Sequence, residues 1–263
     1  MPGWAPKGAR YMRLDSRFDA RAVRWFLRLY GLAIVVDVAT EAWSGVWNVH
    51  TGALYPWRHL GILPLYPARG LAVEWALRVL GGLALGLGAG QVRMVRLGVR
   101  LLVPVLFVAV LERYSNHGVL LLLIALFLSI APPDLARPSF AEESHHALGL
   151  VRAQLVIVYV FSALNKVTHG FGRGDSLANL LALAAGPARI LSLAVIAAEL
   201  ALPVLCYLRP RLGLAGVVVM HAGFALVVPG VWSFGLAMVA MATLHVGPLQ
   251  SGTRRTFPFA FRS

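Results

Sequence analysis

The sequence has one cysteine, Cys206, among its 263 residues. A single cysteine excludes a disulfide within the chain and supplies neither a redox pair nor a zinc-binding set. Charged residues are also scarce, at 13%, and acidic residues number 11 against 24 lysines and arginines. The sequence contains no Gly-x-Ser-x-Gly elbow, no Walker loop and no His-Glu-x-x-His. These absences disfavour hydrolases, nucleotide-driven proteins and zinc proteases.

Apolar residues, in contrast, are abundant. They make up 59% of the chain, and the mean hydropathy is +0.73. A soluble domain of this size cannot bury so much apolar surface, so the composition predicts a polytopic membrane protein. The net charge of +13 could indicate a nucleic-acid partner. However, the basic residues form short clusters between apolar runs, which favours loops that face anionic membrane lipids over nucleic-acid binding.

Apolar runs long enough to cross about 30 Å of hydrocarbon predict an all-α fold, an integral membrane helical bundle of about eight spans. The runs lie at 23–43, 70–91, 94–112, 116–132, 148–168, 187–207, 211–229 and 231–247. The last two runs could instead form one broken helix over 211–247, which would give seven spans.

The basic residues also predict the orientation of the bundle. Lysines and arginines gather at both chain ends and in alternate turns, whereas the opposite turns hold only Arg58, Arg69, Arg113, Arg173 and Arg189. By the positive-inside rule both termini are then cytoplasmic. The predicted organisation is a basic N-terminal segment at 1–22, a transmembrane domain at 23–247 and a C-terminal tail at 248–263.

Two long connections, 44–69 and 169–186, are predicted to lie outside. The first is rich in Trp, Tyr, Pro and Gly, as expected for a loop at the membrane interface. The second contains a leucine-rich stretch, 177–183, which could form a short amphipathic or re-entrant helix. On the cytoplasmic side, His145 and His146 are adjacent and would point apart on a helix. A solvated loop is favoured there, and no metal site is predicted.

Lys166 ends an apolar segment that begins at Arg152 and is long enough to belong to a span. An ammonium in the membrane is costly, so an intramembrane ionisable residue is by default a functional-site hypothesis. A lysine in a dry pocket is also a usable base, because burial disfavours its charged form. The alternative is a lysine that snorkels to the headgroups.

Most of the other polar residues in the spans are predicted to lie near the same, outer leaflet. They are Asp37, Glu41, Glu74, Arg78, Glu112, Arg113, Asn116, His117, Asn165 and His169, with Glu199 and His221 deeper. Glu74 and Arg78 are spaced i,i+4 and are expected to pair. Structural ion pairs would explain part of this set. Ion pairs alone would not explain why this set includes histidines and a lysine without an evident partner. A pocket open to the external leaflet would explain them.

Glycines recur at positions 82, 86 and 90, with four-residue spacing. On a helix this spacing places them on one face, where the absence of side chains allows another helix to approach closely. The glycines are therefore predicted to have a packing role. The same run does not follow a strand, so a dinucleotide-binding site is not expected.

The order of several motifs resembles the vitamin K-dependent gamma-carboxylases and their bacterial relatives, the horizontally transferred transmembrane (HTTM) proteins. The motifs are Arg28-Leu-Tyr-Gly31, Thr51-Gly-Ala-Leu-Tyr-Pro56, Tyr114-Ser-Asn-His117, the segment from Arg152 to Val167, and Glu199-Leu-Ala-Leu-Pro203 followed by His221. The resemblance covers almost the whole chain, and its most specific part is the segment that contains Lys166. Within this family, the chain resembles a short bacterial-type member that lacks the lumenal domain of the animal enzymes.

The resemblance implies that Lys166 is a catalytic base that deprotonates a reduced naphthoquinone, a form of vitamin K of the menaquinol type. The resulting anion would react with oxygen, and the quinol would become an epoxide. A strongly basic intermediate would then remove a proton from a peptide glutamate, which captures carbon dioxide. His117 would be the second catalytic residue. The cofactor-binding residues would be Asn116, Asn165, Tyr159, His221 and Glu199.

Two functional hypotheses arise from the sequence. The first is a lysine-based membrane enzyme that oxidises a quinol, coupled or not to carboxylation of a peptide substrate. The second is a non-catalytic module that binds lipid, quinone or a partner protein and assists export or maturation of a peptide. Either protein is expected in a bacterial inner membrane, with its pocket facing the external leaflet. Lys166 and His117 are expected to border one shared cavity.

Overall fold

The computed structural model describes residues 18–45, 68–112, 115–131, 146–228 and 230–246. Most of the predicted external loop 44–69 and the loop that holds His145 lie outside the described residues. The same is true of the C-terminal tail at 248–263 and of most of the N-terminal segment at 1–22.

In the described part the chain is helical and contains no strand. The helices are α1 (Ala20–Trp43), α3 (Ala68–Leu87), α4 (Val92–Glu112), α5 (Asn116–Ser129), α6 (His146–Thr168), α7 (Asp175–Leu181), α8 (Ala185–Leu208), α9 (Pro210–Val227) and α10 (Trp232–Thr243), with a short 3₁₀ helix, η2 (Phe171–Arg173), before α7. Each of the predicted apolar runs coincides largely with one helix. The leucine-rich stretch lies mainly in α7, which is the short helix expected there.

Five helices (α3, α4, α6, α8 and α9) are long and apolar enough to cross a membrane. Helices α5 and α10 are apolar but shorter, and α1 has 24 residues that include several arginines and two carboxylates. The prediction of an all-α fold with several helices able to span a membrane is thus confirmed. Helices α9 and α10 are separated by a turn in which Gly230 has a φ of 86°, so they do not form one continuous helix.

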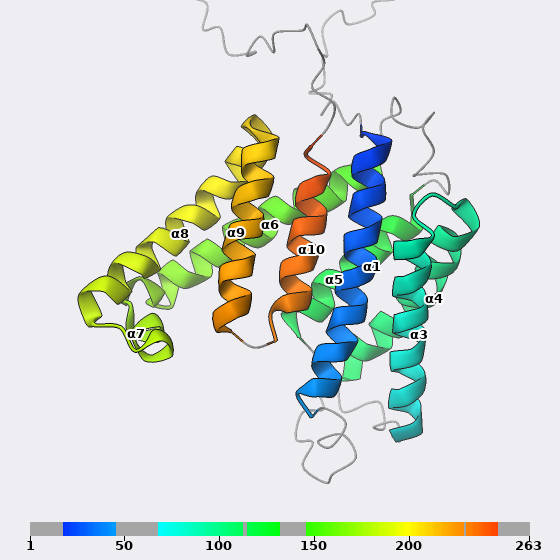
Figure 1. Ribbon diagram of the computed structural model, residues 1–263, viewed down its shortest axis with the longest axis horizontal. Coiled ribbons are helices and arrows are strands. Elements are labelled where there is room, and N and C mark those ends of the chain that lie inside the picture. Colours follow the sequence, from blue (N-terminus) through cyan, green and yellow to red (C-terminus); the bar gives the residue numbers. More distant parts are fainter. Residues whose placement is uncertain (1–17, 46–67, 113–114, 132–145, 229, 247–263) are drawn as a thin grey trace, which may run out of the picture.

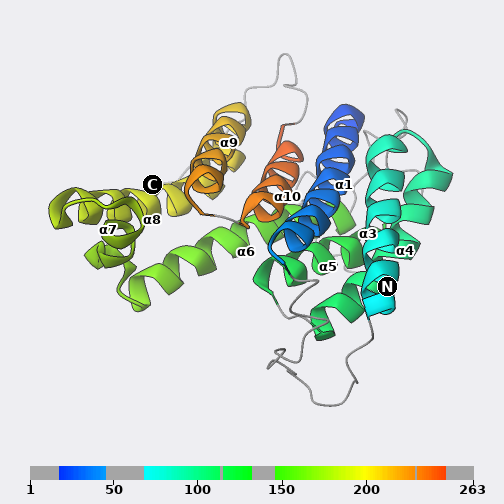
Figure 2. The ribbon, with the colours of Figure 1, turned by 60° about the horizontal axis from the view of Figure 1, so that its bottom comes forward.

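The first and last helices of the described chain lie side by side. Helix α1 packs against α10 on one flank and against α3 on the other, and the row continues from α10 to α9 and from α3 to α4 (Figure 1). Helices α5 and α6 form a second layer behind this row (Figure 2). The buried hydroxyl of Tyr30 on α1 donates to the carbonyl oxygen of Leu121 on α5, at 2.6 Å, and so joins the two layers.

One end of α6 extends away from this centre and is accompanied by α7 and α8 (Figures 1 and 2). The outer surfaces of these helices are apolar, with exposed side chains that include Phe161, Leu164, Leu193 and Leu200. Exposed apolar patches of this extent indicate contact with lipid or protein rather than with water. The projecting end of α6 carries Lys166.

Glycines let α1 and α3 pack at backbone contact. A Cβ atom on Gly82 would lie 2.7 Å from the carbonyl oxygen of Gly31, and one on Gly31 would collide with the backbone of Gly82 and Gly86. The predicted packing role is therefore confirmed for Gly82. A Cβ atom on Gly90 would meet no atom of another helix within 4 Å, because Gly90 lies beyond the end of α3.

Substitution of Gly31 by alanine is expected to lower the free energy of unfolding by about 1–3 kcal/mol, since the added methyl group has no space. The thermal midpoint in detergent, followed by size-exclusion chromatography with fluorescence detection, measures this effect. Gly223→Ala in α9 is the matched control, because nothing lies within 4 Å of its Cβ position. Equal midpoints for the two variants would contradict the close α1–α3 contact.

Candidate functional site

The α6 segment around Lys166 places polar groups along one side of the helix. Tyr159 is buried on the face of α6 that packs into the bundle, in line with Leu155 and Ala163. Ser162 and Lys166 are separated by four residues, which stacks them one turn apart at the edge of this face. The lysine is in the last turn of the helix, where the helix dipole favours a positive charge.

Lys166 forms an ion pair with Glu199 of α8. Its Nζ lies 2.7 Å from Glu199 Oε1 and 2.6 Å from Ser162 Oγ. The Ser162 hydroxyl also donates to Glu199 Oε1, at 2.9 Å. The sequence-based view of a lysine without an evident partner was wrong, because the partner lies on a helix that the sequence does not place beside α6.

The pair is nearly but not fully enclosed. The side chain of Lys166 is 21% exposed and that of Glu199 is 5% exposed. Ser162 and Glu199 occupy two of the three N–H directions of the ammonium, and the Phe171 ring lies 5.7 Å from Nζ. The third N–H of the ammonium has no hydrogen-bond partner among the described residues.

Glu199 has spare acceptor capacity on its other side. Its Oε2 atom is buried and has no hydrogen-bond partner among the described residues. In addition, Pro203 lies four residues further along α8 and has no N–H, so the backbone carbonyl of Glu199 lacks its usual helical donor. A buried acceptor without a donor is costly and is often found at a site that binds water, a proton or a ligand.

Tyr159 and His221 form a second polar pair between α6 and α9. Their Oη and Nε2 atoms are 3.0 Å apart, and both side chains are buried. The His221 ring packs edge-on against Phe234, with centroids 5.5 Å apart. Tyr159 lies one turn before Ser162, so α6 brings this pair close to the pair formed by Lys166 and Glu199.

His117 belongs to a different cluster. Ser115 caps α5 by accepting a hydrogen bond from the Gly118 N–H at 3.1 Å, which fixes the first turn that carries His117. His117 Nε2 lies 3.3 Å from Asp37 Oδ1 of α1. The same Oδ1 accepts a hydrogen bond from Ser233 of α10, at 2.7 Å. A buried carboxylate thus orients a histidine whose side chain is 33% exposed.

Arg78 of α3 holds the acidic side of this cluster together. Its guanidinium forms ion pairs with Asp37, with Glu41 at 2.9 Å and with Glu74 at 3.0 Å. The predicted pairing of Glu74 with Arg78 is confirmed, and two carboxylates of α1 join it. Trp75 also donates to Glu41, at 2.8 Å.

The predicted site residues therefore separate into two groups. Lys166, Glu199, Tyr159 and His221 lie together on α6, α8 and α9, whereas His117 lies with Asp37 on the other side of α10. No hydrogen bond or ion pair among the described residues joins the two groups. Asn165 is exposed beside Lys166, and Asn116 is exposed in the first turn of α5.

The sequence did not single out Ser162 or Ser233. Ser162 could have been found, because it lies four residues before Lys166 and must therefore share its side of a helix. Ser233 gave no such signal, since its partner Asp37 is 196 residues away in the chain. Only the packing of α10 against α1 brings these two residues together.

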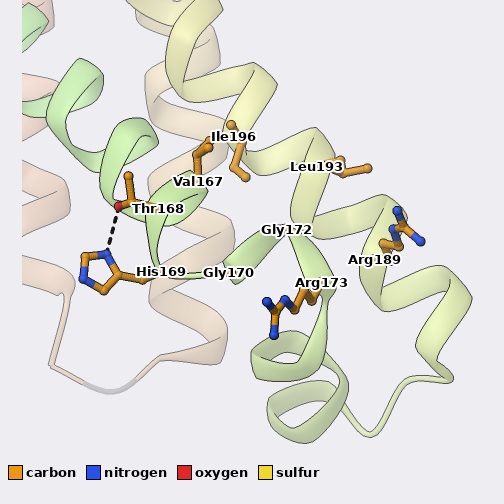
Figure 3. Close-up of a pocket in the computed structure, with 9 residues that line it drawn as sticks. All are labelled: Val167, Thr168, His169, Gly170, Gly172, Arg173, Arg189, Leu193 and Ile196. Atoms are coloured by element: carbon orange, nitrogen blue, oxygen red, sulfur yellow. Dashed lines mark hydrogen bonds between the residues drawn. The ribbon is translucent and has the colours of Figure 1, made fainter.

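A pocket with a volume of about 740 Å³ lies next to this site. It is lined by the end of α6, the turn that contains η2, and the first half of α8 (Figure 3). Its residues include Val167 and Ile196, on the same helices as Lys166 and Glu199. The Thr168 hydroxyl and His169 Nδ1 are 3.0 Å apart at its edge.

Comparisons of this chain with protein-family models, with curated proteins and with solved structures found no match. The resemblance to the carboxylases and HTTM proteins consequently rests on the motifs in the sequence alone. The chemistry of the site has to be inferred from its own residues.

Proposed function

We propose that this protein is a membrane enzyme of the vitamin K-dependent carboxylase type, in which Lys166 acts as a base on a reduced quinone. The observation that carries this proposal is the Lys166–Glu199 pair, which lies at the projecting end of α6 and leaves one N–H of Lys166 without a hydrogen-bond partner among the described residues. A hydroxyl group of a lipid-soluble substrate could approach Lys166 from the direction of that N–H. We limit the proposed reaction to the quinol step and do not extend it to a peptide substrate.

The surroundings of Lys166 suit an aromatic, lipid-soluble molecule. Phe171 lies close to the Lys166 amine, and Val167, which follows Lys166 in the chain, is exposed. The buried Oε2 atom of Glu199 has no hydrogen-bond donor among the described residues. A reduced naphthoquinone would supply an acidic hydroxyl group and reactivity toward oxygen. Exposed apolar residues on α6 and α8, such as Leu164 and Leu200, would let such a molecule approach from the lipid.

In the proposed reaction, the residues of the site take up one proton from the hydroxyl group of the quinol. The neutral amine of Lys166 accepts it at Nζ, and the ammonium so formed is stabilised by Glu199 Oε1 and by the Ser162 hydroxyl. The carboxylate of Glu199 is only 5% exposed, and the scarcity of water around it strengthens this interaction. Tyr159 on α6 and its hydrogen-bond partner His221 on α9 would position the remainder of the substrate.

This proposal is tested by oxygen consumption of the purified protein in lipid nanodiscs with a reduced menaquinone analogue. The protein should consume oxygen faster than empty nanodiscs. A rate equal to that of empty nanodiscs at every pH would remove the enzyme hypothesis.

The alternative is a non-catalytic membrane module that binds a quinone, another lipid or a partner protein. One observation favours it: Glu199 neutralises Lys166, so the lysine can be tolerated in the membrane without a catalytic role. Mass spectrometry of lipids that co-purify with the protein separates the two cases. A quinone that is retained but never oxidised would support the module.

For the membrane arrangement we propose eight crossings in a bacterial inner membrane, with both termini cytoplasmic and Lys166 toward the external leaflet. The asymmetry of lysine and arginine between alternate turns supports this orientation. The alternating direction of the long helices in Figure 1 is compatible with it.

Cysteine labelling tests the orientation in a Cys206→Ala background. We expect an impermeant reagent added outside to label Ser176→Cys on α7 but not Arg93→Cys at the start of α4, because both positions are exposed and lie at opposite ends of the bundle. Labelling of Arg93→Cys alone would reverse the proposed orientation.

A further inference from the structure

The pocket beside α6 is basic. Arg173 and Arg189 line it together with His169, and none of its described lining residues is Asp or Glu. Neither arginine forms an ion pair within the part of the chain that the structure describes, in contrast to Lys166 and Arg78, whose charges are balanced by carboxylates. Two guanidinium groups without a carboxylate create a local excess of positive charge that favours an anion.

The pocket also has an apolar side that continues onto the helices. Val167 and Leu193 line it and are 60% and 50% exposed. Each belongs to a stripe of exposed apolar residues on its own helix: Phe161, Leu164 and Val167 on α6, and Leu193, Leu200 and Val204 on α8. The spacing of three, four or seven residues keeps each stripe on one helix face. Both stripes therefore end at the pocket.

Close backbone packing holds the basic rim in place. Gly174 has a φ of 92°, and a Cβ atom there would lie 2.5 Å from the backbone nitrogen of Arg189. The turn that carries Arg173 is thus pressed against the first turns of α8. Figure 3 shows Arg173 and Arg189 on either side of this turn, with their side chains directed away from each other, so each guanidinium lies at its own edge of the pocket.

We propose that this pocket binds the phosphate headgroup of an anionic membrane lipid, with the acyl chains along the stripes of α6 and α8. Guanidinium groups bind phosphate through paired, charge-assisted hydrogen bonds. A free phosphate compound would need the arginines but not the apolar stripes. A zwitterionic lipid would need the stripes but would not use the excess positive charge. Lys166 and Glu199 are not among the residues that line the pocket, so this inference does not depend on the proposed reaction at Lys166.

Native mass spectrometry of the detergent-purified protein tests the proposal with three probes: dihexanoyl phosphatidylglycerol, dihexanoyl phosphatidylcholine and glycerol 3-phosphate. We expect phosphatidylglycerol to bind at least tenfold more tightly than the other two. The variant Arg173→Gln/Arg189→Gln should lose this preference. Arg93→Gln/Arg96→Gln, which removes two exposed arginines from α4, should keep it.

Three results would overturn the proposal. Equal binding of the two lipids would show that charge does not select the ligand. Glycerol 3-phosphate binding as tightly as phosphatidylglycerol would identify a site for free phosphate compounds. An equal loss of this preference in Arg93→Gln/Arg96→Gln would show that the overall positive charge of the protein, and not this pocket, attracts the lipid. If the double variant does not fold, the single variants Arg173→Gln and Arg189→Gln decide, and each should weaken phosphatidylglycerol binding at least threefold.

Discussion

Lys166→Ala is expected to lower oxygen-dependent oxidation of a reduced menaquinone analogue by a factor of about 100 or more, the usual contribution of a positioned base. The substitution removes the group that accepts the proton. It leaves the fold largely intact, because Lys166 is at the end of α6 and Glu199 retains the hydrogen bond from the Ser162 hydroxyl. Initial rates of oxygen consumption in nanodiscs measure the effect.

Arg93→Ala serves as the control for loss of one positive charge, since Arg93 is exposed at the start of α4. It should oxidise the quinol at the wild-type rate. Size-exclusion profiles of both variants establish that the protein remains folded. Wild-type turnover by Lys166→Ala would show that the lysine is not the base.

Arg78→Gln should have the largest effect on stability, a loss of about 3–5 kcal/mol in the free energy of unfolding. The side chain of Arg78 is 1% exposed, and it supplies the cation that Asp37, Glu41 and Glu74 share. Glutamine keeps part of the volume and hydrogen bonding but not the charge. The thermal midpoint in detergent should fall steeply, whereas Arg93→Gln should leave it nearly unchanged.

A double-mutant cycle with Asp37→Asn shows whether the effect arises from the ion pair. Once Arg78 has been replaced, Asp37→Asn should cost less than it costs in the wild type, or should even restore stability, because it removes a buried charge. Strict additivity of the two substitutions would mean that Arg78 acts through packing alone.

The positions of the helices could be predicted from the sequence because hydropathy is a local property. The runs at 94–112 and 148–168 nearly coincide with α4 and α6, whose ends are set by neighbouring polar and glycine residues. The pairing of Glu74 with Arg78 could be predicted for the same reason, since a spacing of four residues fixes proximity within one helix.

Contacts between helices could not be predicted in this way. Glu199 was recognised as a polar residue in a span, but nothing local indicates that α8 places it beside Lys166. Asp37 likewise contacts His117, Arg78 and Ser233 from three different helices. Periodicity identifies the buried face of a helix but does not identify the helix that covers it.

The glycine repeat shows the same limit. Gly82 and Gly90 are equivalent in the four-residue pattern, yet only Gly82 meets another helix. The difference is that α3 ends at Leu87, before the pattern does. In the candidate site, the division of His117 and Lys166 between two clusters has a similar origin, because α10 inserts between α1 and α9.

The most direct test of the central claim, that Lys166 is a base, is the rate of oxygen-dependent quinol oxidation by Lys166→Arg. Arginine preserves the positive charge and can still pair with Glu199, but it stays protonated at any accessible pH. A lysine that only anchors α6 or neutralises Glu199 should tolerate this change. We predict a folded variant without turnover at any pH, and a wild-type rate in Lys166→Arg would contradict the account.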